Sequence, residues 1–277
     1  MAKENRDKSM LDELVSVIMP TYNTGSFLSV SVESILKQTY QHIELLITDD
    51  GSTDPKTLQI LKDYKERDCR VNVKFLDINS GAGLARNNSI ERAKGRYIAF
   101  CDSDDCWMPE KLERQLALMK EKQCAMCNSS YLLCDEDNKI TGINKAPEKT
   151  TFCMQKHDNK IGCSTLIYDV KMIGEKLYMP DQRKRQDWAF TLTLLMKCGA
   201  CYAVREPLVY YRQRRHSVSS NKFSLVKYNV KVYESVLGYP KWKAYLYFLF
   251  VFLPTYYLKV LKRKWDSRNY MSSHFLS

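Results

Sequence analysis

The sequence predicts an α/β fold in which a mostly parallel central sheet is flanked by helices. Short apolar runs alternate with helically spaced segments through the first half of the chain, and this alternation indicates βαβ units. One such run, residues 97–100, ends in the carboxylates Asp102, Asp104 and Asp105. The length of 277 residues allows one large domain, with or without a C-terminal extension.

Each expected element of the first half has its own sequence signal. Apolar runs predict strands at 14–20, 42–48, 71–76 and 97–100, and apolar spacing predicts helices at 26–38, 55–66, 84–94 and 110–121. Asp54 and Pro55 suit the cap and first position of the second helix, and Gly95 ends the third. These helices are long enough to connect neighbouring parallel strands.

The second half has a looser pattern. Strands are expected at 125–134, 163–168, 202–204 and 208–211, a polar hairpin or loop at 135–149, and an apolar helix from Asp187 to Lys197. Residues 244–258 are uncharged and rich in Tyr, Phe and Leu, with basic residues on both flanks. About 20 apolar residues are needed to span a bilayer. We therefore expect an in-plane or partly embedded membrane helix, or else a helix packed on the domain.

Composition narrows the classes of partner. The net charge of +11 favours polyanionic partners, but no nucleic-acid module accompanies it, so no nucleic acid is expected. Residues 1–12 are charged and lack the apolar segment of a signal peptide. The ten cysteines are then expected to be reduced thiols in a cytoplasmic protein. Two CxxC pairs, Cys124/Cys127 and Cys198/Cys201, allow zinc or redox roles, although buried free cysteines fit better.

The carboxylates after residue 100 suggest a metal site. In an extended chain Asp102 and Asp104 point to the same side, where they repel each other unless a cation lies between them. Oxygen ligands of this kind suit Mg²⁺ or Mn²⁺ bound together with substrate phosphates. The alternative is a helix start, with Asp105 as a cap.

Further polar residues follow the other expected strands. Ligands of open α/β sheets bind beyond the carboxyl ends of the strands, where Asn23, Asp49, Asp50 and Gly81 also fall. Asp49 or Asp50 could accept the ring N–H of uracil, and Tyr22 could stack on the base; a plain tight turn is the alternative. Gly81 and Gly83 lack the third glycine of a dinucleotide loop, which argues against an oxidoreductase.

Two later residues are candidates for the reaction itself. Asp187 could take the proton from an attacking hydroxyl, with Arg183 and Arg185 keeping it ionised, or it could merely cap its helix. His216 lies in a basic segment that suits a diphosphate and could bind a metal, or it could be an ordinary loop histidine.

Six blocks of sequence together carry a resemblance to a known family. They are 17–23 (VIMPTYN), 34–39 (SILKQT), 49–54 (DDGSTD), 85–87 (ARN), 95–98 (GRYI) and 102–105 (DSDD). Their order and spacing resemble family 2 glycosyltransferases of the GT-A fold from about residue 15 to 113, and more loosely to 219. The resemblance implies an inverting transferase of the hexosyltransferase class that uses a nucleotide-sugar, usually a UDP-sugar, and a divalent metal.

The resemblance also implies roles for single residues. The positions that match the nucleotide-sugar site are Pro20, Tyr22, Asn23, Asp49, Asp50, Arg86, Asp102, Ser103, Arg212 and His216. Asp104 would bind the metal on the diphosphate, with Asp102 and His216 as further candidate ligands. The family's catalytic base is usually the Asp of a Glu-Asp pair; here the pair is Gln186-Asp187, so the Asp is kept and the Glu is not.

We therefore expect a flexible N-terminus at 1–12, a GT-A domain at 13–220, and a basic, aromatic helical region at 221–277. The domain divides into a nucleotide-binding half, 13–123, and an acceptor-binding half, 124–220. The expected acceptor is a saccharide or lipid-linked saccharide in surface-polysaccharide synthesis, at the inner face of the cytoplasmic membrane, with membrane contact through 241–268. The alternatives are a binding module without turnover and, less favoured, a nucleotidyltransferase.

Overall fold

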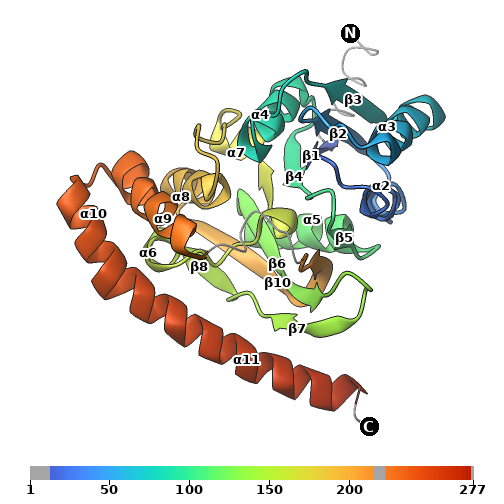
Figure 1. Ribbon diagram of the computed structural model, residues 1–277. Coiled ribbons are helices and arrows are strands. Elements are labelled where there is room, and N and C mark those ends of the chain that lie inside the picture. Colours follow the sequence, from blue (N-terminus) through green and yellow to red (C-terminus); the bar gives the residue numbers. More distant parts are fainter. Residues whose placement is uncertain (1–12, 215–221, 276–277) are drawn as a thin grey trace.

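The first half of the chain forms a parallel sheet. In the computed structural model, which describes residues 13–214 and 222–275, the strands β1 (Val15–Thr21), β2 (Ile43–Asp49), β3 (Val71–Phe75) and β4 (Tyr97–Phe100) lie in the order β3-β2-β1-β4 (Figure 1). All three pairings between them are parallel. Because β1 and β2 are buried along almost their whole length, they are apolar runs rather than alternating ones. The predicted parallel core is confirmed.

Helices follow these strands as predicted. They are α2 (Phe27–Leu36), α3 (Pro55–Arg67), α4 (Ala82–Arg92) and α5 (Lys111–Lys122). The expected cap of α3 is present, because the Asp54 carboxylate accepts a hydrogen bond of 2.9 Å from the Thr57 amide. The expected cap of α5 is wrong: α5 begins after Glu110, and Asp105 is buried five residues earlier.

The second half adds mixed pairing to the sheet. Its strands are β5 (Cys106–Trp107), β6 (Met126–Cys134), β7 (Ile140–Asn144), β8 (Lys149–Thr151), β9 (Ile167–Asp169) and β10 (Ala200–Arg212). Strand β9 lies between β4 and β6, antiparallel to both, so one sheet runs through both halves. The expected strand 163–168 is instead a short 3-10 helix, Cys163–Thr165, followed by β9.

Strand β10 corrects another expectation. The segments 202–204 and 208–211 belong to one strand, whose register with β6 shifts on both sides of Pro207. Proline has no amide hydrogen for the ladder, so an irregularity at this position is expected.

Pairing of β10 with β6 also brings the two CxxC pairs onto neighbouring elements. All four cysteines are free thiols, and Cys124, Cys127 and Cys201 are buried.

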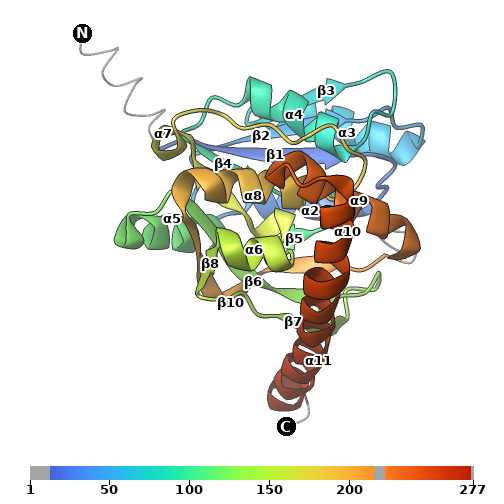
Figure 2. The same cartoon turned by 90° about the vertical axis from the view of Figure 1, so that its left-hand side faces the viewer.

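Helices α6 (Phe152–His157), α7 (Val170–Ile173) and α8 (Gln186–Cys198) belong to the second half, and α9 (Lys222–Leu237) packs on α8. After α10 (Lys241–Tyr247) a π-helical turn (Phe248–Phe252) leads into α11 (Leu253–Phe275). These three segments form one long helix that runs down the side of the molecule past β7 (Figures 1 and 2). The π-turn ends two residues before Pro254, whose missing amide hydrogen disturbs the normal α-helical ladder.

The long helix packs on the domain and also exposes apolar side chains. Ala244, Phe248 and Phe252 are buried in one cluster with Trp188 of α8. The opposite side exposes large apolar residues: Trp242, Tyr245, Leu246, Leu249, Phe250, Leu253, Tyr257, Leu258, Leu261 and Trp265. By length and composition alone the 34-residue helix is able to cross a membrane, and 17% of its most apolar stretch is buried against the protein.

Candidate active site

Hydrogen bonds join the loops at the carboxyl ends of β1 and β2. Asn23 has a left-handed backbone conformation with φ of 48°, which Asn tolerates better than most residues. Its side-chain oxygen accepts hydrogen bonds from the amides of Thr53 (2.8 Å) and Asp54 (2.9 Å), and its own amide donates to Ser52 Oγ (2.9 Å). The observed role of Asn23 is therefore to fix the spacing of these two loops.

Asp49 and Asp50 continue this network toward the next strand. Both are buried; the Asp49 carboxylate accepts from the Ser52 amide at 3.0 Å, and the Asp50 carboxylate accepts from the amides of Ser80 (2.8 Å) and Gly81 (2.7 Å). Gly81 has φ of 99°, a conformation that favours glycine. The two carboxylates hold the loops in place, and each retains lone pairs that could accept a further N–H.

The remaining residues expected around the base lie at the same edge. Pro20 is buried within β1, whereas Tyr22, just beyond its end, is 47% exposed. An exposed ring beside two fixed carboxylates is able to stack on a planar base. Pro20, Tyr22, Asp49 and Asp50, the residues predicted to surround the base, thus lie at one edge of the sheet.

Arg86 connects this edge to the aspartates after β4. It comes from α4, is 5% exposed, and forms an ion pair with Asp102. The Asp102 amide donates to Ser164 Oγ at 3.0 Å, and the Ser164 hydroxyl in turn donates to Asp105. Ser164, which belongs to the second half of the chain, therefore fixes the turn that carries Asp102 and Asp105.

Asp104 has the surroundings expected of a cation ligand. Burial and the charge of Asp102 raise the pKa of Asp104, and the positive charge of Arg214 offsets this rise only in part. Arg214 forms an ion pair with Asp104, with 3.6 Å between its guanidinium and the carboxylate. Among the described residues no three His, Cys, Asp or Glu side chains cluster as metal ligands. Two carboxylates nevertheless fit Mg²⁺ or Mn²⁺, because such ions complete their shell with water and substrate phosphates.

The other predicted residues of this region have structural partners. Ser103 is buried and its hydroxyl shares a 2.8 Å hydrogen bond with Thr24. The Arg212 guanidinium donates to the Asp104 carbonyl oxygen (3.0 Å) and to Asn138 Oδ1 (2.7 Å), so it braces the aspartate turn. Arg214, two residues further along, is the arginine that faces a carboxylate. His216 lies outside the described residues.

Asp187 lies in the first turn of α8. The helix cap is Arg185, so the interpretation of Asp187 as a cap is wrong. The side-chain amide of Asn159 donates a hydrogen bond of 3.3 Å to the Asp187 carboxylate and orients it. Asp187 lies near enough to act electrostatically on Arg86 and Cys163. A negative charge is also favoured at a helix N-terminus.

Arg183 lies over the loop after β3 rather than on Asp187. Its guanidinium donates to Asn79 Oδ1 at 2.9 Å, and its side chain also lies against Gly81. This contact covers the loop after β3 from the side of the second half.

Several polar atoms of Arg86, Gln182 and Gln186 have no hydrogen-bond partner among residues 13–214 and 222–275. Within the described part of the chain, Arg86 Nε, both amide atoms of Gln182, and Gln186 Oε1 are buried and without a hydrogen-bond partner. The Gln186 side chain and the Gln182 backbone carbonyl oxygen both lie within 4 Å of the position that a Cβ of Gly83 would take, one helical turn before Arg86. Buried polar groups normally have partners, so a group of orphaned atoms in one place indicates a polar ligand.

Comparison with known proteins agrees with this geometry. The family model for glycosyl transferase family 2 matches residues 16–177, more than half of the chain. The chain belongs to glycosyltransferase family 2. It is therefore a glycosyltransferase, and both the family and the GT-A fold predicted from the sequence are confirmed.

Relatives of this family 2 glycosyltransferase are found over most of its length. It is 42% identical to the putative teichuronic acid biosynthesis glycosyltransferase TuaG of Bacillus subtilis, covering 80% of this chain and 88% of TuaG. It is 35% identical to the UDP-Glc:alpha-D-GlcNAc-diphosphoundecaprenol beta-1,3-glucosyltransferase WfgD of Escherichia coli, covering 79% and 84%. The crystal structure of S. aureus TarS with UDP-GlcNAc has the same fold, with a TM-score of 0.67 at 20% identity over 96% of this chain and 76% of that one.

Sequence patterns did not single out Arg214, Asn159 or Ser164. Arg214 carried one weak signal: it follows Arg212 by two positions and so points to the same side of an extended chain. Asn159 and Ser164 carried none, because their roles depend on contacts with Asp187 and Asp105 that the fold creates.

Proposed function

We propose that this protein is an inverting glycosyltransferase that moves a sugar from a UDP-sugar to a lipid-linked saccharide, with Asp187 as the general base. The observation that carries the proposal is the position of Asp187. Its carboxylate is held by Asn159 within electrostatic reach of Arg86, which pairs with Asp102. A base thus lies beside the residues that would hold the donor.

The proposed donor site uses the edge formed by β1, β2 and β4. The uracil ring of the donor would stack on Tyr22, and Asp49 or Asp50 would accept its ring N–H. Asp102 and Arg86 would lie toward the ribose and phosphates. Asp104 with Asp102 would hold a divalent cation, which when bound offsets the negative charge of the leaving diphosphate. Arg214 is the arginine placed to add positive charge there.

The transfer itself is a single displacement. The acceptor hydroxyl oxygen forms a bond to the anomeric carbon as the bond from that carbon to the diphosphate oxygen breaks, and its electron pair leaves with UDP. The hydroxyl proton passes to Asp187. Attack from the face opposite the leaving group inverts the configuration. The contact of Arg183 with Asn79 helps to cover the donor and limits hydrolysis by water.

The relatives and the long helix support the proposed acceptor and location. WfgD is named for a diphosphoundecaprenol acceptor. The exposed aromatic and aliphatic side chains of α10 and α11 suit the interface of a membrane, where such an acceptor resides. We place the enzyme in the cytoplasm, bound to the inner face of the membrane, in surface-polysaccharide synthesis.

The test compares Asp187→Asn with the exposed control Asp181→Asn. UDP-sugar binding, UDP release and transfer to prenyl-diphosphate-linked sugars are measured with Mn²⁺. Asp187→Asn is expected to lower transfer about 10²- to 10⁴-fold and to leave UDP-sugar affinity within about twofold. The control is expected to match wild type. Wild-type protein that binds UDP-sugar without releasing UDP, even with acceptor present, would be a binding module instead.

A further inference from the structure

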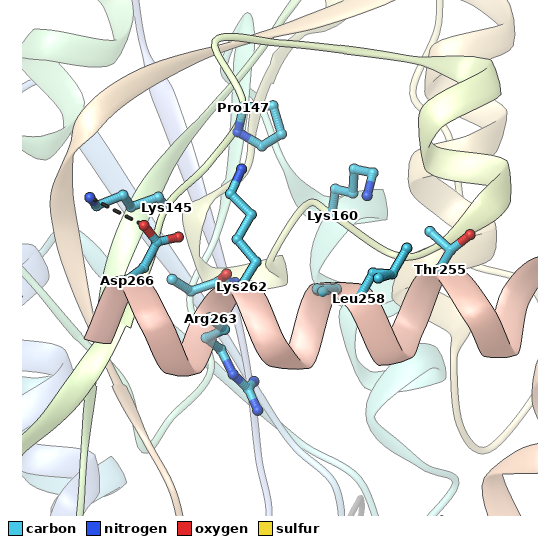
Figure 3. Close-up of a pocket in the computed structure, with 10 residues that line it drawn as sticks. Lys145, Pro147, Lys160, Thr255, Leu258, Lys262, Arg263 and Asp266 are labelled. Atoms are coloured by element: carbon cyan, nitrogen blue, oxygen red, sulfur yellow. Dashed lines mark ion pairs between the residues drawn. The ribbon is translucent and has the colours of Figure 1, made fainter. Parts of the chain in front are cut away.

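A basic pocket lies between α11 and two segments, one that follows β7 and one that follows α6. Its volume is about 250 Å³, and five basic side chains line it together with one acidic side chain: Lys145, Lys160, Lys259, Lys262, Arg263 and Asp266. Figure 3 shows Lys262 rising from α11 with its amine beside Pro147. The pocket is thus built from residues more than a hundred positions apart in sequence.

The positive charges in this pocket outnumber their carboxylate partners. The buried Asp158 carboxylate pairs with both Lys259 (3.0 Å) and Lys160 (3.7 Å), and Asp266 pairs with Lys145 (3.4 Å). Within the described residues neither Lys262 nor Arg263 pairs with a carboxylate. Five cations against two carboxylates leave an excess that suits a multiply charged anion such as a diphosphate.

The wall of the pocket reaches the proposed catalytic base. The Lys259 amine donates to the backbone carbonyl of Asn159, and the Asn159 side chain donates to the Asp187 carboxylate. An anion held beside Lys259 and Lys160 therefore lies next to the acceptor side of the reaction centre.

The pocket also opens onto the apolar surface of the long helix. Leu258 lines the pocket and is 65% exposed, and the neighbouring Tyr257 is 63% exposed. One helix therefore offers cations and a lipid-facing surface side by side, an arrangement that matches a ligand with an anionic head and a hydrocarbon chain.

Building on the proposed function, we propose that this pocket binds the diphosphate of a polyprenyl-diphosphate-linked acceptor. The hydrocarbon chain then lies along the exposed face of α11, and the sugar is directed toward Asp187. Such an anchor explains how one acceptor carried by a membrane is presented to a base inside the domain.

The test measures binding of farnesyl diphosphate, a short prenyl diphosphate without a sugar, to the full-length protein by calorimetry. Lys262→Glu reverses the charge of a pocket lysine that has no carboxylate partner, and Lys264→Glu is the matched control, an exposed lysine of the same helix outside the pocket. We expect the Kd to rise at least tenfold in Lys262→Glu, less in Lys262→Gln, and less than twofold in Lys264→Glu. Circular dichroism checks that the variants fold.

Several results would overturn the proposal. They are an absence of farnesyl diphosphate binding, equal weakening by both charge reversals, and inorganic pyrophosphate binding as tightly as the prenyl compound. Binding to phosphatidylglycerol vesicles is measured with the same variants. If Lys262→Glu weakens vesicle binding more than it weakens farnesyl diphosphate binding, the pocket is a phospholipid site instead. UDP-sugar binding is measured in parallel and tests the proposed transferase function separately. The protein could bind a UDP-sugar without binding farnesyl diphosphate, and the reverse is equally possible.

Discussion

Replacement of Trp188 tests whether the long C-terminal helix is part of the folded unit. Trp188 is fully buried, its ring centroid lies 5.5 Å from that of Tyr233 and 5.3 Å from that of Phe252, and its indole N–H donates to the Gln155 carbonyl oxygen at 2.7 Å. Truncation of a buried Trp to Ala costs about 3–5 kcal/mol. We therefore expect Trp188→Ala to lower the free energy of unfolding by about 4 kcal/mol.

The assay is urea unfolding followed by far-UV circular dichroism. With an m-value of about 3 kcal/mol per M for a chain of this size, a loss of about 4 kcal/mol lowers the midpoint by about 1.3 M. The matched control is Trp265→Ala, since Trp265 is 63% exposed on α11 and its loss should change stability by less than about 0.5 kcal/mol. Equal midpoints for the two variants, or separate unfolding of the C-terminal helices in wild type, would refute the shared core.

Three further predictions concern stability and the donor site. Burial lowers the pKa of Lys111 to about 7, whereas its value in the unfolded chain is about 10.4. Between these two pH values the unfolded state binds more protons than the folded state, so the free energy of unfolding rises with pH. Urea unfolding at pH 7 to 9 should show that wild type gains up to about 1.4 kcal/mol per pH unit relative to Lys111→Met; parallel curves would contradict this. Gly95→Ala should cost about 3 kcal/mol, because its Cβ would lie 2.5 Å from the Leu14 carbonyl oxygen; an unchanged melting temperature would contradict this. Arg86→Met should cost about 3 kcal/mol in urea unfolding and weaken UDP binding in calorimetry, since it leaves Asp102 without its ion-pair partner; tight UDP binding would remove Arg86 from the donor site.

The parallel half of the fold was predictable because its signals are local. The runs that form β1 and β2 are mostly apolar, and Asp54 with Pro55 starts α3 as expected. Asp49, Asp50 and Asp102 each lie at or just after the carboxyl end of a parallel strand. Such ends meet at one edge of an open sheet, where ligands bind. Local periodicity and turn chemistry were sufficient here.

The second half was less predictable because its structure depends on distant contacts. Pro207 interrupts the strand pattern, yet pairing with β6 keeps β10 continuous on both sides of it. The nucleotide-sugar role of Arg212 stays a prediction, and its hydrogen bonds to the Asp104 carbonyl oxygen and to Asn138 could not be foreseen from local sequence. The basic pocket combines Lys160 with Lys262, and no local pattern links these two positions.

The three-residue strand β9 has a consequence for recombination between members of the family. It is hydrogen-bonded to β4 on one side and to β6 on the other, and Tyr168 within it packs against Phe100 and Phe190. A chimera that exchanges the second half of the chain after α5 therefore keeps the loop after β4 intact only if this aromatic trio is inherited together. Graft compatibility between two relatives can be judged from these three side chains before any variant is made.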